Sequence, residues 1–187
     1  NVTVSGSIGE TGANKGIETL IVNKGSSLDV TGSVYTNALD LRADTALTAG
    51  NGSGDVVVAQ AADIKGDLTA GTLSLGESSK IAGDAVVDVK SFVLGSTKDL
   101  TVGNADAGAT IVADTFVLSG GKLVVDPEYG NPASKIVVDN ITDTKTEIDA
   151  KIAGDILIGK NSVVSIGYSQ TEFKDVMADY LVQNGGF

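Results

Sequence analysis

Carboxylates provide most of the chemistry that this sequence could perform. The chain has 187 residues, 24 of them acidic and 13 basic, and it contains neither histidine nor cysteine. Imidazole bases, thiol nucleophiles, disulfides and the usual zinc ligands are therefore excluded. Some β-helical enzymes cleave polysaccharides with clustered carboxylates, and five aspartates on expected strands or corners could be gathered in this way by stacking: Asp29, Asp40, Asp67, Asp84 and Asp155.

The spacing of these aspartates selects no catalytic pair, because the sequence fixes no separation between any two of them. Like charges stacked about 5 Å apart repel each other unless a cation or a lysine lies between them. Lys80, Lys98 and Lys122 precede expected strands and could pair locally with neighbouring aspartates. The favoured interpretation is a solvated surface whose carboxylates prevent aggregation.

Two glycine-rich stretches resemble ligand-binding loops but depart from their patterns. Gly120-Gly-Lys-Leu lacks the hydroxyl residue of a phosphate-binding loop and connects two expected strands. Gly50-Asn-Gly-Ser-Gly-Asp is one residue out of register with the calcium-binding repeat of secreted toxins, and it occurs once. No serine lies in a G-x-S-x-G elbow. We therefore expect no enzyme activity, no catalytic or metal-binding residue and no cofactor.

The charge balance narrows the range of partners. A net charge of -11 repels nucleic acid phosphates and anionic lipid headgroups. No window approaches the roughly 18 apolar residues that span a bilayer. We expect any targeting segment to have been removed or to lie outside this sequence, and membrane association to depend on regions outside it.

Short apolar segments separated by polar turns recur along the chain. The phrase Phe-Val-Leu begins at Phe92 and returns at Phe116, and each copy is followed by a turn and a second apolar segment. Comparable pairs begin at Leu20, Leu39 and Leu73, and the long step from Leu39 to Leu73 predicts an insertion or an extra coil. Apolar residues make up 42% of the chain and aromatics 4%, which favours a β core of Val, Leu, Ile and Ala.

A second signature places glycine between two apolar residues and before a small polar one. It has the form Val-Ser-Gly-Ser-Ile or Ile-Ala-Gly-Asp-Ala, and its five copies are centred on Gly6, Gly32, Gly66, Gly83 and Gly154. We interpret it as a sharp corner: glycine adopts the backbone angle, and Ser or Asp accepts hydrogen bonds from exposed amides.

These repeats predict an all-β fold, a right-handed parallel β-helix, rather than the rival antiparallel sandwich. Residues 1–168 form the expected solenoid, with Phe92 stacked on Phe116 inside it. Residues 169–187 are expected to form a short C-terminal capping helix of the same domain, because Ser169-Gln-Thr-Glu resembles a capping box and an apolar helical face follows it.

One proline-containing stretch interrupts the repeats. It runs from Asp126 to Ser134, contains both prolines of the chain and predicts a loop that leaves the rod. Such a loop could be a recognition loop presenting Glu128, Tyr129 and Asn131, whereas an ordinary insertion between coils is the alternative that we favour.

The phrases at residues 68–76 and 116–125 resemble the passenger regions of bacterial autotransporters and filamentous-haemagglutinin-like adhesins. The resemblance implies a β-helical rod at, or released from, the bacterial outer surface, mediating adhesion or aggregation. Its partners would be a protein or glycan of a host or neighbouring cell, or a second copy of the chain. The Ile-x-Gly-Asp copies resemble bactofilins, and the acidic, cysteine-free composition is similar to that of surface-layer proteins. A polymer-forming subunit is therefore the alternative, and a polysaccharide-degrading enzyme is a third, less favoured one.

Overall fold

The computed structural model describes residues 1–12, 16–104, 107–125, 134–143, 147–150 and 155–158. A single 3-10 turn, η1, spans Gly50–Gly52 in this part of the chain. The strands are Val2–Val4 (β1), Ile17–Val22 (β2), Ser27–Val30 (β3), Val34–Leu41 (β4), Ala46–Ala49 (β5), Asp55–Val58 (β6), Ala62–Ile64 (β7), Asp67–Leu75 (β8), Ser79–Ile81 (β9), Val86–Leu94 (β10), Leu100–Val102 (β11), Thr110–Leu118 (β12), Lys122–Val125 (β13), Lys135–Asp143 (β14), Glu147–Ala150 (β15) and Asp155–Ile158 (β16).

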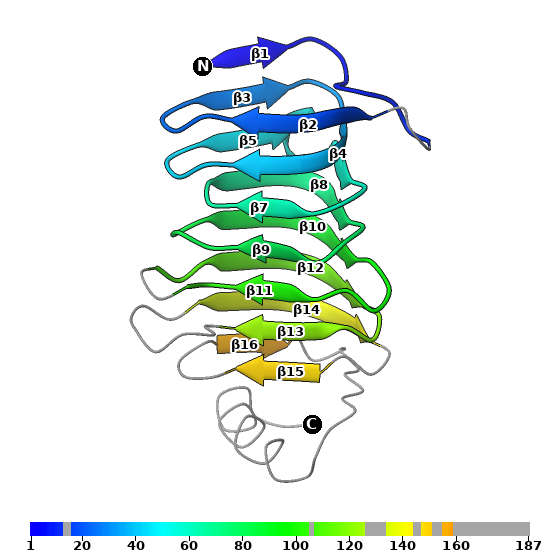
Figure 1. The fold of residues 1–187 in the computed structure, drawn as a ribbon, viewed down its shortest axis with the longest axis vertical. Helices are drawn as coiled ribbons and strands as arrows, with labels where there is room; N and C mark the ends of the chain where they lie inside the picture. Colours follow the sequence, from blue (N-terminus) through cyan, green and yellow to red (C-terminus); the bar gives the residue numbers. More distant parts are fainter. Residues whose placement is uncertain (13–15, 105–106, 126–133, 144–146, 151–154, 159–187) are drawn as a thin grey trace, which may run out of the picture.

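All strand pairs among the described residues are parallel, which identifies the fold as a β-helix. Each strand between the two ends of the rod pairs with its counterparts one coil earlier and one coil later in the chain. The antiparallel sandwich is therefore wrong. Figure 1 shows the coils descending from β1 in a right-handed winding, the hand that parallel crossovers adopt almost without exception.

The long strands bend and so divide each coil into three faces. The first half of β4 pairs with β6 and its second half with β7, while the two halves of β8 pair with β5 and β6. Face 1 contains β2, the second half of β4, and β7, β9, β11, β13 and β15. Face 2 contains β1, β3, β5, the first halves of β8, β10, β12 and β14, and β16. Face 3 contains the first half of β4, β6, and the second halves of β8, β10, β12 and β14.

The interior is filled by stacked apolar side chains. Alternate residues of each strand point inward, and Leu73, Phe92 and Phe116 occupy successive coils of face 3 with no exposed surface. The Phe92 and Phe116 rings have centroids 4.6 Å apart at a tilted angle, a favourable aromatic contact. The predicted stacking of Phe92 on Phe116 is confirmed.

The glycine signature marks corners, as predicted, but at two different places in the coil. Gly6 and Gly32 lie between faces 2 and 3, whereas Gly66 and Gly83 lie between faces 1 and 2. Gly83 has a φ of +70°, while a Cβ on Gly66 would overlap Thr45 Oγ1 of the preceding coil. Gly154 lies outside the described residues.

The small polar residue after the glycine binds the next coil. Ser7 Oγ accepts a hydrogen bond from the Ser33 amide at 3.1 Å, and Ser33 Oγ accepts one from the Asp55 amide at 2.9 Å. Asp67 Oδ1 accepts one from the Val86 amide at 3.0 Å. The predicted capping role is confirmed at these corners, and it joins consecutive coils where strand pairing is interrupted.

Different copies of the repeated apolar segment lie on different faces of the rod, which the sequence did not indicate. The copies at Leu20 and Leu39 lie on face 1, whereas those at Leu73 and Phe92 lie on face 3. The long step from Leu39 to Leu73 contains β6 and β7, so it holds a full coil and a change of face. The expected second strands are all present, but they too divide between faces.

The predicted capping helix at residues 169–187 lies outside the described residues. Among the described residues, no helix has the length and apolar character needed to cross a membrane.

The core predicts a large difference between inward and outward substitutions on β12. Phe116→Ala should lower the free energy of unfolding by about 3–5 kcal/mol, because it removes a buried ring and leaves a cavity. Val112→Ala on the same strand should cost less than about 1 kcal/mol, because Val112 points outward and is 38% exposed. Urea denaturation followed by circular dichroism measures both, and similar losses would contradict the assignment of β12 side chains to inside and outside.

Candidate functional site

The first candidate for a functional site is the recognition loop predicted from the sequence. Glu128, Tyr129 and Asn131 lie outside the described residues. The candidate functional surfaces among the described residues are therefore the outer sides of the three faces and the corners between them.

The structure distributes the predicted aspartates over separate surfaces. Asp40 points outward from face 1 and Asp29 from face 2, while Asp67 and Asp84 lie at the corner between these faces. Asp155 begins β16, and its side chain is not among those described. Within the described part of the chain, no three acidic residues are placed to hold a metal ion together.

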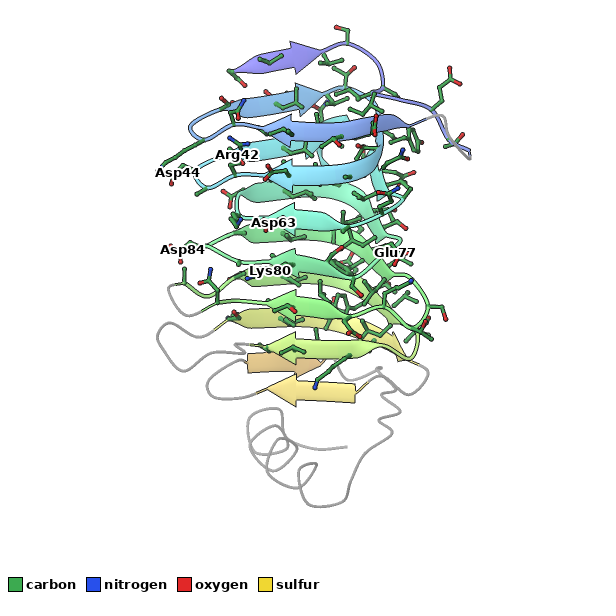
Figure 2. The ribbon with its side chains drawn as sticks, viewed as in Figure 1. Arg42, Asp44, Asp63, Glu77, Lys80 and Asp84 are labelled. Atoms are coloured by element: carbon green, nitrogen blue, oxygen red, sulfur yellow. The ribbon has the colours of Figure 1, made fainter. Side chains whose placement is uncertain are left out.

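Face 1 carries a row of charges of both signs. Asp63 stacks between Asp40 of the preceding coil and Lys80 of the next one. Arg42 Nε lies 3.3 Å from Asp40 Oδ2, and Lys65 Nζ lies 2.6 Å from Asp63 Oδ2. The stacked aspartates are therefore each paired with a basic residue two positions further along their own coil. Figure 2 labels Asp63 and Lys80 on neighbouring coils of this face.

Asp63 is the most constrained of these groups. Its Oδ1 atom is buried and has no hydrogen-bond partner among the described residues, although the side chain as a whole is 45% exposed. Removal of a nearby positive charge should therefore lower the free energy of unfolding more at Asp63 than at a fully solvated carboxylate.

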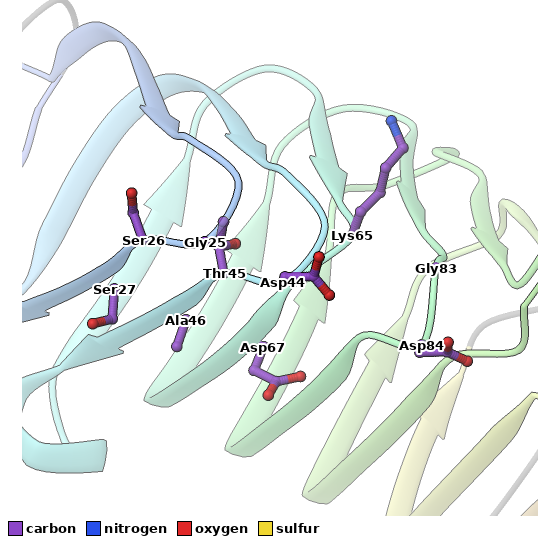
Figure 3. A pocket seen from close by; sticks show the side chains of 11 residues that line it. Gly25, Ser26, Ser27, Asp44, Thr45, Ala46, Lys65, Asp67, Gly83 and Asp84 are labelled. Atoms are coloured by element: carbon purple, nitrogen blue, oxygen red, sulfur yellow. The ribbon is translucent and has the colours of Figure 1, made fainter. Parts of the chain in front are cut away.

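An open groove of about 410 Å³ follows the corner between faces 1 and 2. Successive coils line it with hydroxyl and carboxylate groups, among them Ser26, Asp44, Asp67 and Asp84, and with Lys65. Figure 3 shows that the Lys65 side chain extends away from Asp67. The lining is polar and contains no aromatic residue.

The carboxylates of this groove have structural roles that account for their presence. Asp44 pairs with Lys24 at 3.2 Å, and Asp67 accepts the Val86 amide. Asp44 and Asp84 have φ angles of 57° and 61°, a left-handed conformation that aspartate tolerates better than most residues. Asp44 was not predicted as a groove residue, because the sequence does not reveal which corners stack.

A smaller pocket of about 140 Å³ lies beside Tyr35 near the N-terminal end of face 3. Glu10, Asn37 and Val57 also line it. The Tyr35 amide donates to the Ile8 carbonyl at 2.8 Å, so the backbone of this pocket belongs to the coil ladder.

The rest of face 3 differs from the other surfaces in carrying almost no charge. Its outward positions form two rows of mostly half-buried residues, with Asp55 the one charged side chain in them among the described residues. One row contains Asp55, Thr72, Ser91 and Thr115, and the other contains Tyr35, Val57, Ser74, Val93, Val117 and the exposed Thr142. This surface was not predicted from the sequence, although the segments Thr-Leu-Ser-Leu, Ser-Phe-Val-Leu and Thr-Phe-Val-Leu signal it.

Comparison with known protein families, curated proteins and solved structures finds no match to this chain.

The face 1 row predicts a salt-dependent effect of removing one lysine. Lys65→Ala should lower the free energy of unfolding by less than about 1 kcal/mol, because the pair is partly exposed. Added salt should recover much of this loss by screening the stacked Asp40 and Asp63. Thermal unfolding at low and high ionic strength measures the effect.

Lys24→Ala provides the control, because the Lys24 and Asp44 side chains are 73% and 70% exposed and Asp44 lies outside the stacked row. Its loss should be smaller and respond less to salt. Equal responses of the two variants would show that stacking in the row adds no repulsion.

Proposed function

We propose that this chain is the β-helical rod of a bacterial cell-surface or secreted structural protein that acts in adhesion or aggregation. The observation that carries the proposal is the filled interior. Leu68, Phe92, Leu100 and Ile111 have no exposed surface, and they belong to one continuous apolar cluster. Both pockets described above are open to the outside. A ligand of the described rod would therefore bind its outer faces or corners.

The pattern of the repeats supports a surface location. The resemblance to autotransporter passengers and filamentous-haemagglutinin-like adhesins favours display at the bacterial outer membrane or release from it. The partners of such a rod would be proteins or glycans of a host or neighbouring cell. With a net charge of -11, nucleic acids and anionic membranes would be unfavourable partners.

A polymer-forming or surface-layer subunit is the second candidate function, and the charge-poor face 3 favours it. Outward valines and hydroxyl residues can pack against another protein surface without burying unpaired charges. Adhesion and assembly are compatible, because different faces of one rod can serve each.

The adhesive function predicts saturable binding of the folded chain to cells. Fluorescent beads coated with residues 1–187 should bind bacterial or epithelial cells more than beads coated with the urea-unfolded chain, which has the same composition and charge. Flow cytometry measures the binding, and competition with free chain tests saturation.

Two results would count against this function. Equal binding of folded and unfolded chain would indicate a nonspecific charge effect. Release of reducing ends from acidic glycans, lost when single aspartates are replaced, would instead support the polysaccharide-degrading alternative.

A further inference from the structure

Face 3 is a nearly neutral surface on a strongly acidic protein. The chain has 24 acidic residues, yet the outward positions of face 3 on β8, β10 and β12 are threonine, serine and valine. Charges that approach this face, Asp55 and Glu10, lie toward its N-terminal end. The remaining part, from Thr72 to Val117, is uncharged and half-buried.

Charged residues border this neutral surface on both sides. At the corner with face 2, exposed Lys90 is followed in the next coil by exposed Asp114. On the other side, Lys98 Nζ lies 2.6 Å from Glu77 Oε2. A neutral centre with a charged border is the arrangement found in protein–protein interfaces.

Small and larger side chains alternate on this surface, and such a surface can pack against another sheet. Ser74 lies between Val57 and Val93 in one row, so a small side chain separates two larger ones. Val93 then stacks directly on Val117. Two sheets pack about 10 Å apart when such side chains interdigitate, and two identical faces have the same repeat of about 4.8 Å along the rod.

We propose that face 3 is the surface through which two copies of this chain associate, face to face about a two-fold axis. The charge distribution selects a second copy as the occupant. Contact through the corner groove would bring like charges together, because Asp44, Asp67 and Asp84 lie there. Contact through face 1 would bury a row of charges of both signs. The neutral part of face 3 lets two chains of charge -11 meet without opposing carboxylates.

The size of the surface determines how strong this association is. The uncharged part of face 3 lies on β8, β10 and β12 and covers about 14 Å along the rod and about 12 Å across it, from spacings of about 4.8 Å and 3.3 Å. A pair of such surfaces buries on the order of 300 Å², well below the roughly 1,600 Å² of a stable complex. A single pair is therefore weak and transient, and many copies displayed side by side would associate strongly through avidity.

The inference rests on the proposed function in one respect, because aggregation is the process that such a contact would serve. It names the face and the partner, which the proposed function leaves open.

Matched double substitutions on two faces test whether the chain associates through face 3. Val93→Asp with Val117→Asp places two charges on face 3, from β10 and β12. Val86→Asp with Val112→Asp makes the same chemical change on the same two strands, but on face 2, where these valines are 41% and 38% exposed. Circular dichroism and thermal unfolding establish that each variant is folded.

Sedimentation velocity from about 10 µM to about 1 mM reports the association. The unchanged chain should form dimers that increase with salt, because salt screens the net repulsion. The face 3 variant should remain monomeric under all these conditions, and the face 2 variant should behave like the unchanged chain. A monomeric unchanged chain, or equal loss in both variants, would overturn the proposal.

The free edge of β2 at the N-terminal end is the competing contact, since β2 pairs with β4 alone. Ile21→Asp tests it, because Ile21 points outward from β2 and is 48% exposed. Loss of dimers in this variant, with dimers retained in the face 3 variant, would assign association to the edge and contradict the proposal.

Cross-linking provides a test that does not depend on charged variants folding. The chain has no cysteine, so a single introduced thiol is unique. Ser74→Cys on face 3 should give disulfide-linked dimers under mild oxidation, and Thr69→Cys on face 2 of the same strand should give few. Equal yields would overturn the proposal.

Failure of the inference and failure of the proposed function can be told apart. Beads carrying the face 3 variant that still bind cells, while the unchanged chain stays monomeric, would disprove self-association and leave adhesion standing. Dimers without any cell binding would retain the interface and remove the adhesive function.

Discussion

In-register parallel stacking of the coils is the constraint on which the rest of the structure depends. Each backbone amide and carbonyl on a strand needs a partner in a neighbouring coil, and parallel pairing provides it only when equivalent residues lie on top of one another. Inward positions are then mostly apolar in successive coils, as in the row Leu73, Phe92 and Phe116. Where pairing stops at corners, Ser7, Ser33 and Asp67 accept the exposed amides.

The same constraint organises the outer surface. A residue that points outward has a neighbour of its own register about 4.8 Å away in the next coil, so side-chain chemistry is repeated or opposed in rows. On face 1 the row of Asp40 and Asp63 is accompanied by Arg42 and Lys65, which offset the repulsion. On face 3 the rows contain threonine, serine and valine on β8, β10 and β12. Face 1 therefore presents charged side chains to a partner, whereas face 3 presents mainly neutral ones.

The recurrent phrases made the fold class accessible from the sequence, because stacking requires repeated apolar and turn positions. The strands of the repeated apolar segments, the corner glycines from Gly6 to Gly83 and the contact between Phe92 and Phe116 could be predicted for this reason. The number of faces could not. An apolar-x-apolar segment has the same pattern on every face, so Leu39 on face 1 and Leu73 on face 3 look equivalent in the sequence.

By itself, the sequence determined that this protein is a β-solenoid with a core of aliphatic residues and that neither histidine nor cysteine chemistry is available to it. Only the tertiary structure decided which residues share a surface. It separated Asp29, Asp40 and Asp84, and it brought Val57, Ser74 and Val93 into one neutral row. The physical reason is that coil lengths vary, so spacing along the chain does not give the register, which hydrogen bonding between coils sets instead.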